Sequence, residues 1–115
     1  MISLTKDSEK YVIATFSNEI EKLNIVISDK VKAKLTAVID DNCRHLIIDL
    51  ATIKYIDSSG FGSLVTIFNH AKNREVGLSL CNISNETMDL LSITKLDQVF
   101  DIKADLKTAI DSISE

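Results

Sequence analysis

The residues best placed to do chemistry stand where a strand pattern ends and a helix pattern begins. They form the run Ile56-Asp57-Ser58-Ser59-Gly60-Phe61-Gly62. In open α/β sheets, strand ends and helix N-termini present unpaired N–H groups and a partial positive charge, so a hydroxyl there is exposed and suits a phosphate. Three chemistries compete for this position: a nucleophilic serine, a phosphate-binding loop, and a serine that is itself phosphorylated.

A nucleophilic serine is the first alternative, and the sequence disfavours it. The strand–turn–helix elbow of hydrolases needs G-x-S-x-G, and no glycine precedes Ser58 or Ser59. His45 stands before the serines and His70 lies within the following helix pattern, so neither completes the Ser, Asp, His order of that fold. We expect both histidines to be partly exposed polar residues that flank their elements, rather than bases or metal ligands.

Nucleotide binding is the second alternative, with Gly60 and Gly62 around a phosphate. The sequence contains neither G-x-x-x-x-G-K-[ST] nor G-x-G-x-x-G. The carboxylate of Asp57 would repel a bound phosphate, and no lysine or arginine occurs between Tyr55 and His70 to offset that charge. The third alternative is that Ser58 or Ser59 is itself a covalent phosphate acceptor that a protein partner reads.

Hydrophobic patterns predict the strands that position this run. Residues 2–5 and 11–16 are typical of a hairpin, because the second segment is rich in β-branched and aromatic residues. The nearly unbroken apolar run 46–50 predicts a central strand that is covered on both faces. The alternating segment 78–83, just after Gly77, predicts another strand that lies nearer an edge.

Periods of three to four residues predict four helices between and after these strands. The first is expected from Ser28, as its N-cap, to Asp40, and the second after an N-cap at Asp57 or Ser58. The third runs from Ser84 to about residue 93, and the fourth covers residues 106–113. We therefore predict one α/β domain over residues 1–115. Its sheet is mixed and mostly parallel, with four or five strands, an N-terminal hairpin and about four helices.

Composition limits the classes of function. The 115 residues suit one domain, and a net charge of -4 lacks the positive field that nucleic acid requires of a direct partner. No apolar run is long enough for a membrane span, and no basic and apolar leader opens the chain, so we expect a cytoplasmic protein that does not enter a membrane. Cys43 and Cys81 lack metal-ligand spacing and are expected to be buried, reduced thiols.

The runs Ile47-Ile48-Asp49-Leu50 and Tyr55-Ile56-Asp57-Ser58-Ser59-Gly60-Phe61-Gly62 resemble the STAS family of bacterial anti-sigma factor antagonists. The resemblance extends along the whole chain. Members are single small α/β domains with a similar order of strands and helices, and their D-S-S-G signature opens the second helix. In that family the first serine after the aspartate is phosphorylated by the anti-sigma factor, a serine kinase. The resemblance thus implies phosphorylation at Ser58, with Ser59 as the second choice.

The family's behaviour implies a partner switch and no enzymatic activity. The unmodified protein would bind the anti-sigma factor and free a sigma factor, the phosphorylated form would let go, and a serine phosphatase would reset the cycle. ATP and magnesium would belong to the kinase, so no cofactor is expected for this protein. The alternative is an accessory subunit of a transporter or lipid-trafficking complex, in which the same fold is a structural brace that needs no phosphorylation.

One segment departs from the family pattern. Members usually carry L-x-G-x-L-D before the first helix, whereas residues 16–24 lack the glycine and end in Leu23-Asn24. Asn24 either lines the partner surface in place of the aspartate or is a turn residue. Asp57 is open to two compatible roles, as helix cap and as switch element, and the glycines either admit a partner or pack on the sheet. The expected partner surface comprises Asn24, Asp57, Ser58, Ser59, Gly60, Phe61 and Gly62.

Overall fold

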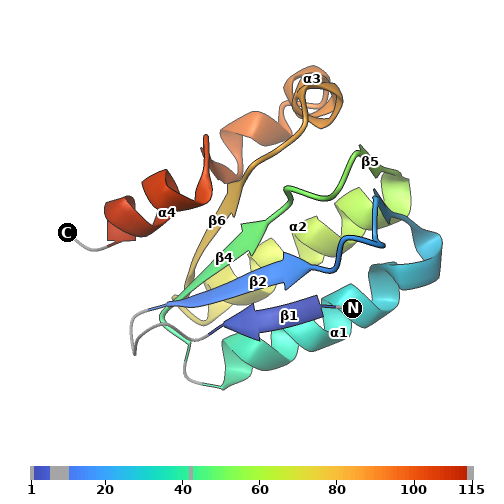
Figure 1. Ribbon diagram of the computed structural model, residues 1–115. Coiled ribbons are helices and arrows are strands. Elements are labelled where there is room, and N and C mark those ends of the chain that lie inside the picture. Colours follow the sequence, from blue (N-terminus) through green and yellow to red (C-terminus); the bar gives the residue numbers. More distant parts are fainter. Residues whose placement is uncertain (1, 6–10, 42, 114–115) are drawn as a thin grey trace.

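Strands and helices alternate along most of the chain (Figure 1). The computed structural model describes residues 2–5, 11–41 and 43–113. Within these ranges the strands are β1 (Ile2–Thr5), β2 (Val12–Phe16), β3 (Lys22–Leu23), β4 (His45–Asp49), β5 (Tyr55–Ile56), β6 (Gly77–Cys81) and β7 (Asp101–Lys103). The helices are α1 (Ile25–Asp40), α2 (Ser58–Asn73), α3 (Asn85–Ile93) and α4 (Leu106–Ile113), and a short 3-10 turn, η1, covers Leu96–Gln98.

The main sheet has five strands in the order β1-β2-β4-β6-β7. β1 pairs antiparallel with β2, which confirms the predicted hairpin, and every other pair in this sheet is parallel. β4 lies in the middle, and its residues Leu46, Ile47 and Ile48 are fully buried, as the apolar run predicted. β6 is one strand from the edge, which is formed by β7, a strand that the sequence analysis did not predict.

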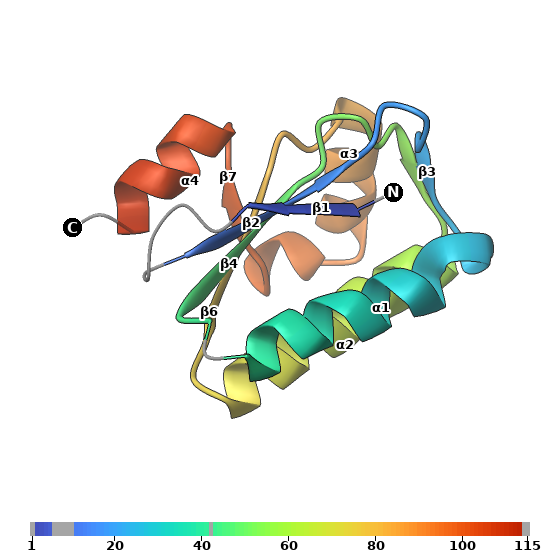
Figure 2. The same ribbon diagram turned by 60° about the horizontal axis from the view of Figure 1, so that its bottom comes forward.

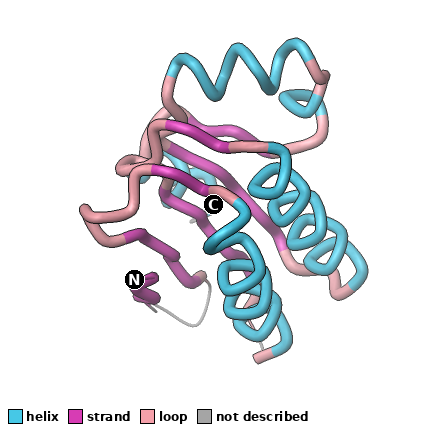
Figure 3. Tube along the Cα trace, turned by 90° about the vertical axis from the view of Figure 1, so that its right-hand side faces the viewer, coloured by secondary structure: helices cyan, strands magenta, loops and turns pink. Residues whose placement is uncertain are grey.

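The helices form a layer on each face of the main sheet. The long helices α1 and α2 lie side by side on one face, and the short helix α4 lies on the other (Figures 2 and 3). Val31, Leu35 and Ile39 of α1 join the core, and each such side chain contributes about 1.5–3 kcal/mol when it leaves water. The predicted α/β architecture is therefore confirmed.

The start of α1 differs from the prediction. The helix begins at Ile25 and not after Ser28, because Asn24 is its N-cap and accepts a hydrogen bond from the Val26 N–H at 3.1 Å. Asparagine caps a helix as well as serine does. Ser28 instead is buried in the first turn, where its carbonyl oxygen accepts from the Ser63 hydroxyl at 3.1 Å. The apolar residues of the first turn are exposed and do not belong to the buried stripe of α1. The helical period of that stripe therefore predicted a start that was too late.

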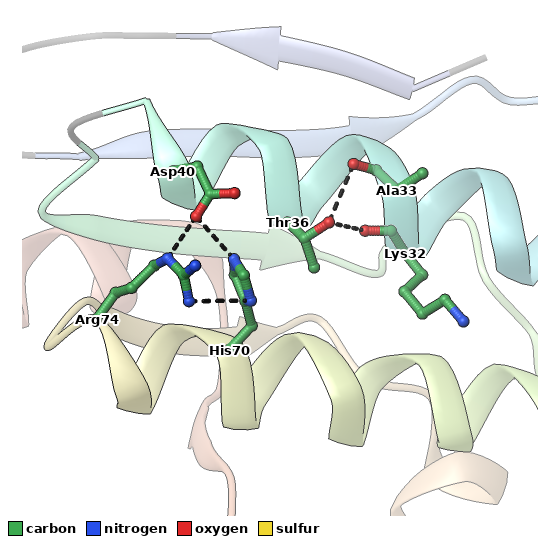
Figure 4. Close-up of polar contacts among 6 residues, drawn as sticks. All are labelled: Lys32, Ala33, Thr36, Asp40, His70 and Arg74. Atoms are coloured by element: carbon green, nitrogen blue, oxygen red, sulfur yellow. Dashed lines mark hydrogen bonds and ion pairs between the residues drawn. The ribbon is translucent and has the colours of Figure 1, made fainter.

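The C-terminal ends of α1 and α2 are joined by a polar cluster (Figure 4). One carboxylate oxygen of Asp40 contacts Nε2 of His70 at 2.8 Å and Nε of Arg74 at 2.5 Å. Nη1 of Arg74 lies 3.3 Å from Nδ1 of His70, and a guanidinium can only donate, so Nδ1 accepts and Nε2 carries the hydrogen that goes to Asp40. His70 is half-buried, as predicted, and serves to join two helices.

Both cysteines are buried, as predicted, and no disulfide joins them. Burial raises the pKa of Cys81 to about 12, with smaller contributions from Asp49 and Asp105, so its thiol stays protonated at neutral pH. No helix in the described ranges is both long and apolar enough to cross a membrane.

Candidate functional site

The predicted site residues lie where the two-stranded sheet of β3 and β5 meets the first turns of α1 and α2. β3 and β5 are parallel neighbours, with Leu23 opposite Ile56, and the Asp57 N–H donates to the Leu23 carbonyl oxygen at 3.2 Å. Because α1 follows β3 and α2 follows β5, the two helices begin side by side. This pairing brings Asn24 close to Asp57, although the two residues are far apart in the sequence.

Asp57 is the N-cap of α2, one of the two predicted possibilities. Its Oδ1 accepts a hydrogen bond from the Gly60 N–H at 2.9 Å. Its Oδ2 accepts from the Ile25 N–H of α1 at 3.3 Å. The carboxylate therefore contacts the first turns of both helices.

Ser58 is the first residue of α2, and its side chain is exposed. Its hydroxyl has no hydrogen-bond partner among the described residues. Ser59 is half-buried, so it is less accessible to another protein. Of the two serines, Ser58 is the better placed to accept a phosphoryl group.

The two glycines of the motif have different surroundings. Gly60 is buried, and a Cβ there would lie 2.3 Å from the Leu23 carbonyl oxygen and 2.7 Å from Cγ2 of Ile56. Gly60 therefore lets α2 pack directly on β3. Gly62 is exposed and a Cβ there would meet nothing within 4 Å, while Phe61 packs its half-buried ring against the core.

Large apolar side chains are exposed beside this site. Ile25 and Val26, in the first turn of α1, are 72% and 75% exposed, and Tyr55 of β5 is 50% exposed. A shallow groove of about 350 Å³, whose lining includes Glu19, Asn24 and Val26, adjoins the start of α1. The sequence analysis did not single out Ile25 and Val26. Two adjacent apolar residues directly after a cap-forming asparagine were the signal that could have revealed them.

A second set of serine, histidine and aspartate lies elsewhere, across three neighbouring strands. Nε2 of His45 on β4 is 2.7 Å from Oγ of Ser79 on β6, and that hydroxyl donates to Oδ2 of Asp101 on β7 at 3.0 Å. A serine nucleophile must give its proton to histidine, with the aspartate on the far nitrogen. Here the aspartate accepts from the serine, and Ser79 is fully buried. The set is a structural network, and His45 is half-buried, as predicted.

Burial of His45 is expected to make the stability of the fold depend on pH. Burial lowers the pKa of His45 below its usual value of 6.5; Asp101 opposes this shift and Lys103 adds to it. The unfolded chain therefore binds the proton more readily, and we expect the free energy of unfolding to fall as the pH drops below about 6.5. Urea titrations would measure the unfolding free energy at pH 7.5 and pH 5.5. The decrease between the two pH values should be smaller for His45→Gln than for the wild type. Equal losses would contradict this assignment.

A family model described as the STAS domain matches residues 10–109. The anti-sigma-B factor antagonist of Listeria monocytogenes is 36% identical over 56 residues, which are 49% of this chain and 49% of that protein. A STAS-domain containing protein of Pseudomonas aeruginosa is 36% identical over 59 residues, which are 51% of this chain and 58% of that protein. The match thus spans about half the length of each of these two relatives.

Two solved structures illustrate the likeness of fold. An anti-sigma-factor antagonist (STAS) domain protein from Planctomyces limnophilus superposes with a TM-score of 0.89 at 19% identity, over 99% of this chain and 98% of that one. The Bacillus cell fate determinant SpoIIAA, in its phosphorylated form, superposes with a TM-score of 0.75 at 18% identity, over 98% of this chain and 99% of that one.

Proposed function

The chain belongs to the STAS domain family, and from this premise we propose that it is an anti-sigma factor antagonist controlled by phosphorylation of Ser58. In the proposed cycle the unphosphorylated protein binds an anti-sigma factor serine kinase, and a sigma factor is thereby released to act in transcription. Transfer of a phosphoryl group to Ser58 ends the binding, and a serine phosphatase restores it. The cofactors of that transfer, ATP and magnesium, belong to the kinase.

The observation that carries this proposal is the exposed Ser58 hydroxyl, which is unbonded within the described ranges and opens α2. A kinase must reach the acceptor oxygen, and no hydrogen bond to a described residue has to be broken first. The exposed side chains of Ile25, Val26 and Tyr55 support docking at the same place, because exposed apolar clusters with a polar rim are typical of interaction surfaces. The phosphorylated form of SpoIIAA, a protein of the same fold, adds a precedent for the modification.

Electrostatics explain how one phosphoryl group could release the partner. It adds about -1.5 to -2 charges beside Asp57. At a separation of ~5 Å and an effective dielectric constant of ~20, each pair of unit charges repels by about 3 kcal/mol. The helix dipole at the N-terminus of α2 stabilises the phosphoryl group by only about 0.3–2 kcal/mol. On the free protein, water screens the repulsion between the phosphoryl group and Asp57. A docked partner removes this water, so the modification weakens the complex.

We propose further that the domain comprises residues 1–115 and acts in the cytoplasm without a cofactor of its own. The expected partner surface is the one that the motif defines, with Asn24 and Asp57 flanking Ser58 and with Ser59, Phe61 and Gly62 at the start of α2. Gly60 was expected there too, but it is buried against β3 and lies beneath this surface. We propose that Ile25 and Val26, which are exposed in the first turn of α1, continue this surface.

The test of the proposed function is intact-mass spectrometry with peptide mapping on the protein purified from its native cells. We expect a fraction that carries one phosphate on Ser58 and that changes between growth and stress. A phosphate on Ser59 would assign the acceptor to Ser59 instead of Ser58. Uniformly unmodified protein under both conditions would contradict the switch and favour the accessory subunit of a transporter or lipid-trafficking complex.

A further inference from the structure

The carboxylate of Asp57 bridges two helices whose first residues are far apart in the sequence. Its Oδ1 accepts from the Gly60 N–H of α2 at 2.9 Å, and its Oδ2 accepts from the Ile25 N–H of α1 at 3.3 Å. We infer that Asp57 is a positioning residue that ties these helix ends together and holds Ile25 and Val26 beside Ser58, and that a phosphoryl group on Ser58 loosens the tie. The inference rests on the function proposed above.

The first turn of α1 shows why Asp57 is needed there. The first four N–H groups of a helix lack partners within the helix. The side chain of Asn24 accepts from the Val26 N–H at 3.1 Å, and the Asn24 carbonyl oxygen accepts from the Ile27 and Ser28 N–H groups at 3.1 and 2.8 Å. The Ile25 N–H is thus the remaining donor of this turn, and its acceptor belongs to the other helix.

The tie fixes the part of the chain that the short sheet does not reach. Pairing of β3 with β5 ends at Leu23, whose carbonyl oxygen accepts from the Asp57 N–H. Two residues later the Asp57 side chain holds Ile25, and Ile25 and Val26 are the most exposed apolar pair next to Ser58, at 72% and 75%. One residue therefore holds the chain on both sides of Asn24, through its backbone and through its carboxylate.

A phosphoryl group on Ser58 would act on this tie directly. It stands on the residue next to Asp57, carries up to two negative charges, and offers three acceptor oxygens to the same N–H donors. The stretch from Tyr55 to His70 contains no lysine or arginine. The bond to Ile25 is longer than the bond to Gly60, at 3.3 against 2.9 Å, so it is the one expected to break first. Phosphorylation would then alter the apolar half of the surface as well as its charge.

The variant Asp57→Asn separates the two bonds. Asparagine caps a helix as well as aspartate and keeps one oxygen for the Gly60 N–H, but its amide group cannot accept from the Ile25 N–H. We would measure amide exchange with water by NMR on the isolated full chain. Exchange at Ile25 is expected to be about fivefold faster in Asp57→Asn, whereas the amides of Val26 and Gly60 should change by less than about twofold.

The variant Ser58→Glu, which places a carboxylate on the acceptor residue, should accelerate exchange at Ile25 in the same selective way. Unchanged exchange at Ile25 in Asp57→Asn would overturn the tie, and an equal acceleration at all three amides would show fraying of both helix ends and overturn it too. An effect in Asp57→Asn without one in Ser58→Glu would overturn the link to phosphorylation. These measurements need neither kinase nor partner. They therefore test the tie independently of the proposed function.

Discussion

The variant Gly60→Ala is expected to lose about 2–3 kcal/mol of unfolding free energy, although alanine favours a helix more than glycine does. Its Cβ would lie 2.3 Å from the Leu23 carbonyl oxygen and 2.7 Å from Cγ2 of Ile56. The first of these atoms is backbone, held by the pairing of β3 with β5, and it also accepts from the Asp57 N–H. Relief of the overlap therefore requires α2 to move away from β3, at the cost of the contacts that position Ser58.

The variant Gly62→Ala is the matched control, because it makes the same change in the same helix two residues later. Nothing lies within 4 Å of a Cβ at this position. Only the gain in helix propensity remains, so we expect about 0.5–1 kcal/mol of stabilisation. Urea unfolding followed by circular dichroism would compare the two variants with the wild type. Stabilisation of Gly60→Ala like that of Gly62→Ala would contradict the close packing of α2 on β3.

The second large effect concerns the binding of the proposed partner, an anti-sigma factor kinase. The variant Ser58→Ala should bind it as the wild type does, because it removes a hydroxyl with no hydrogen-bond partner in the described part of the chain. The variant Ser58→Asp should bind about 100-fold more weakly, because a fixed negative charge beside Asp57 loses its water when the partner docks. Isothermal titration calorimetry with the purified kinase would measure both affinities.

Two further variants make this comparison specific. Ser112→Asp adds the same charge to an exposed residue of α4, which lies away from β5 and the start of α2 in Figure 1, and it should bind normally. Ser59→Asp tests the second candidate acceptor. Equal binding by Ser58→Ala and Ser58→Asp would refute the switch, and a loss confined to Ser59→Asp would assign it to Ser59.

Elements with a strong pattern of their own were predictable from the sequence. β4 is an apolar run buried on both faces, and α2 repeats its apolar residues at helical spacing after a capping aspartate. β5 is the strand end that was expected just before the two serines. β3 has two residues and β7 has three, which is too short for any period to show. These strands exist because neighbouring segments pair with them, so the sequence analysis missed them.

The sequence by itself determined that the second long helix begins at Asp57 or Ser58, where two serines follow an aspartate at the end of a strand. The structure identified Asp57 as the cap. These features depend on residues that are neighbours in the chain. The assignment of Ser58 as the acceptor and of the partner surface stays a prediction.

Only the tertiary structure decided that Gly60 packs on Leu23, that Asp57 also binds the Ile25 N–H, and that Ile25 and Val26 are exposed beside Ser58. Asp57 and Ile25 are 32 residues apart, and no local pattern links them. Their contact arises because β3 and β5 pair in parallel and so start both helices at the same edge.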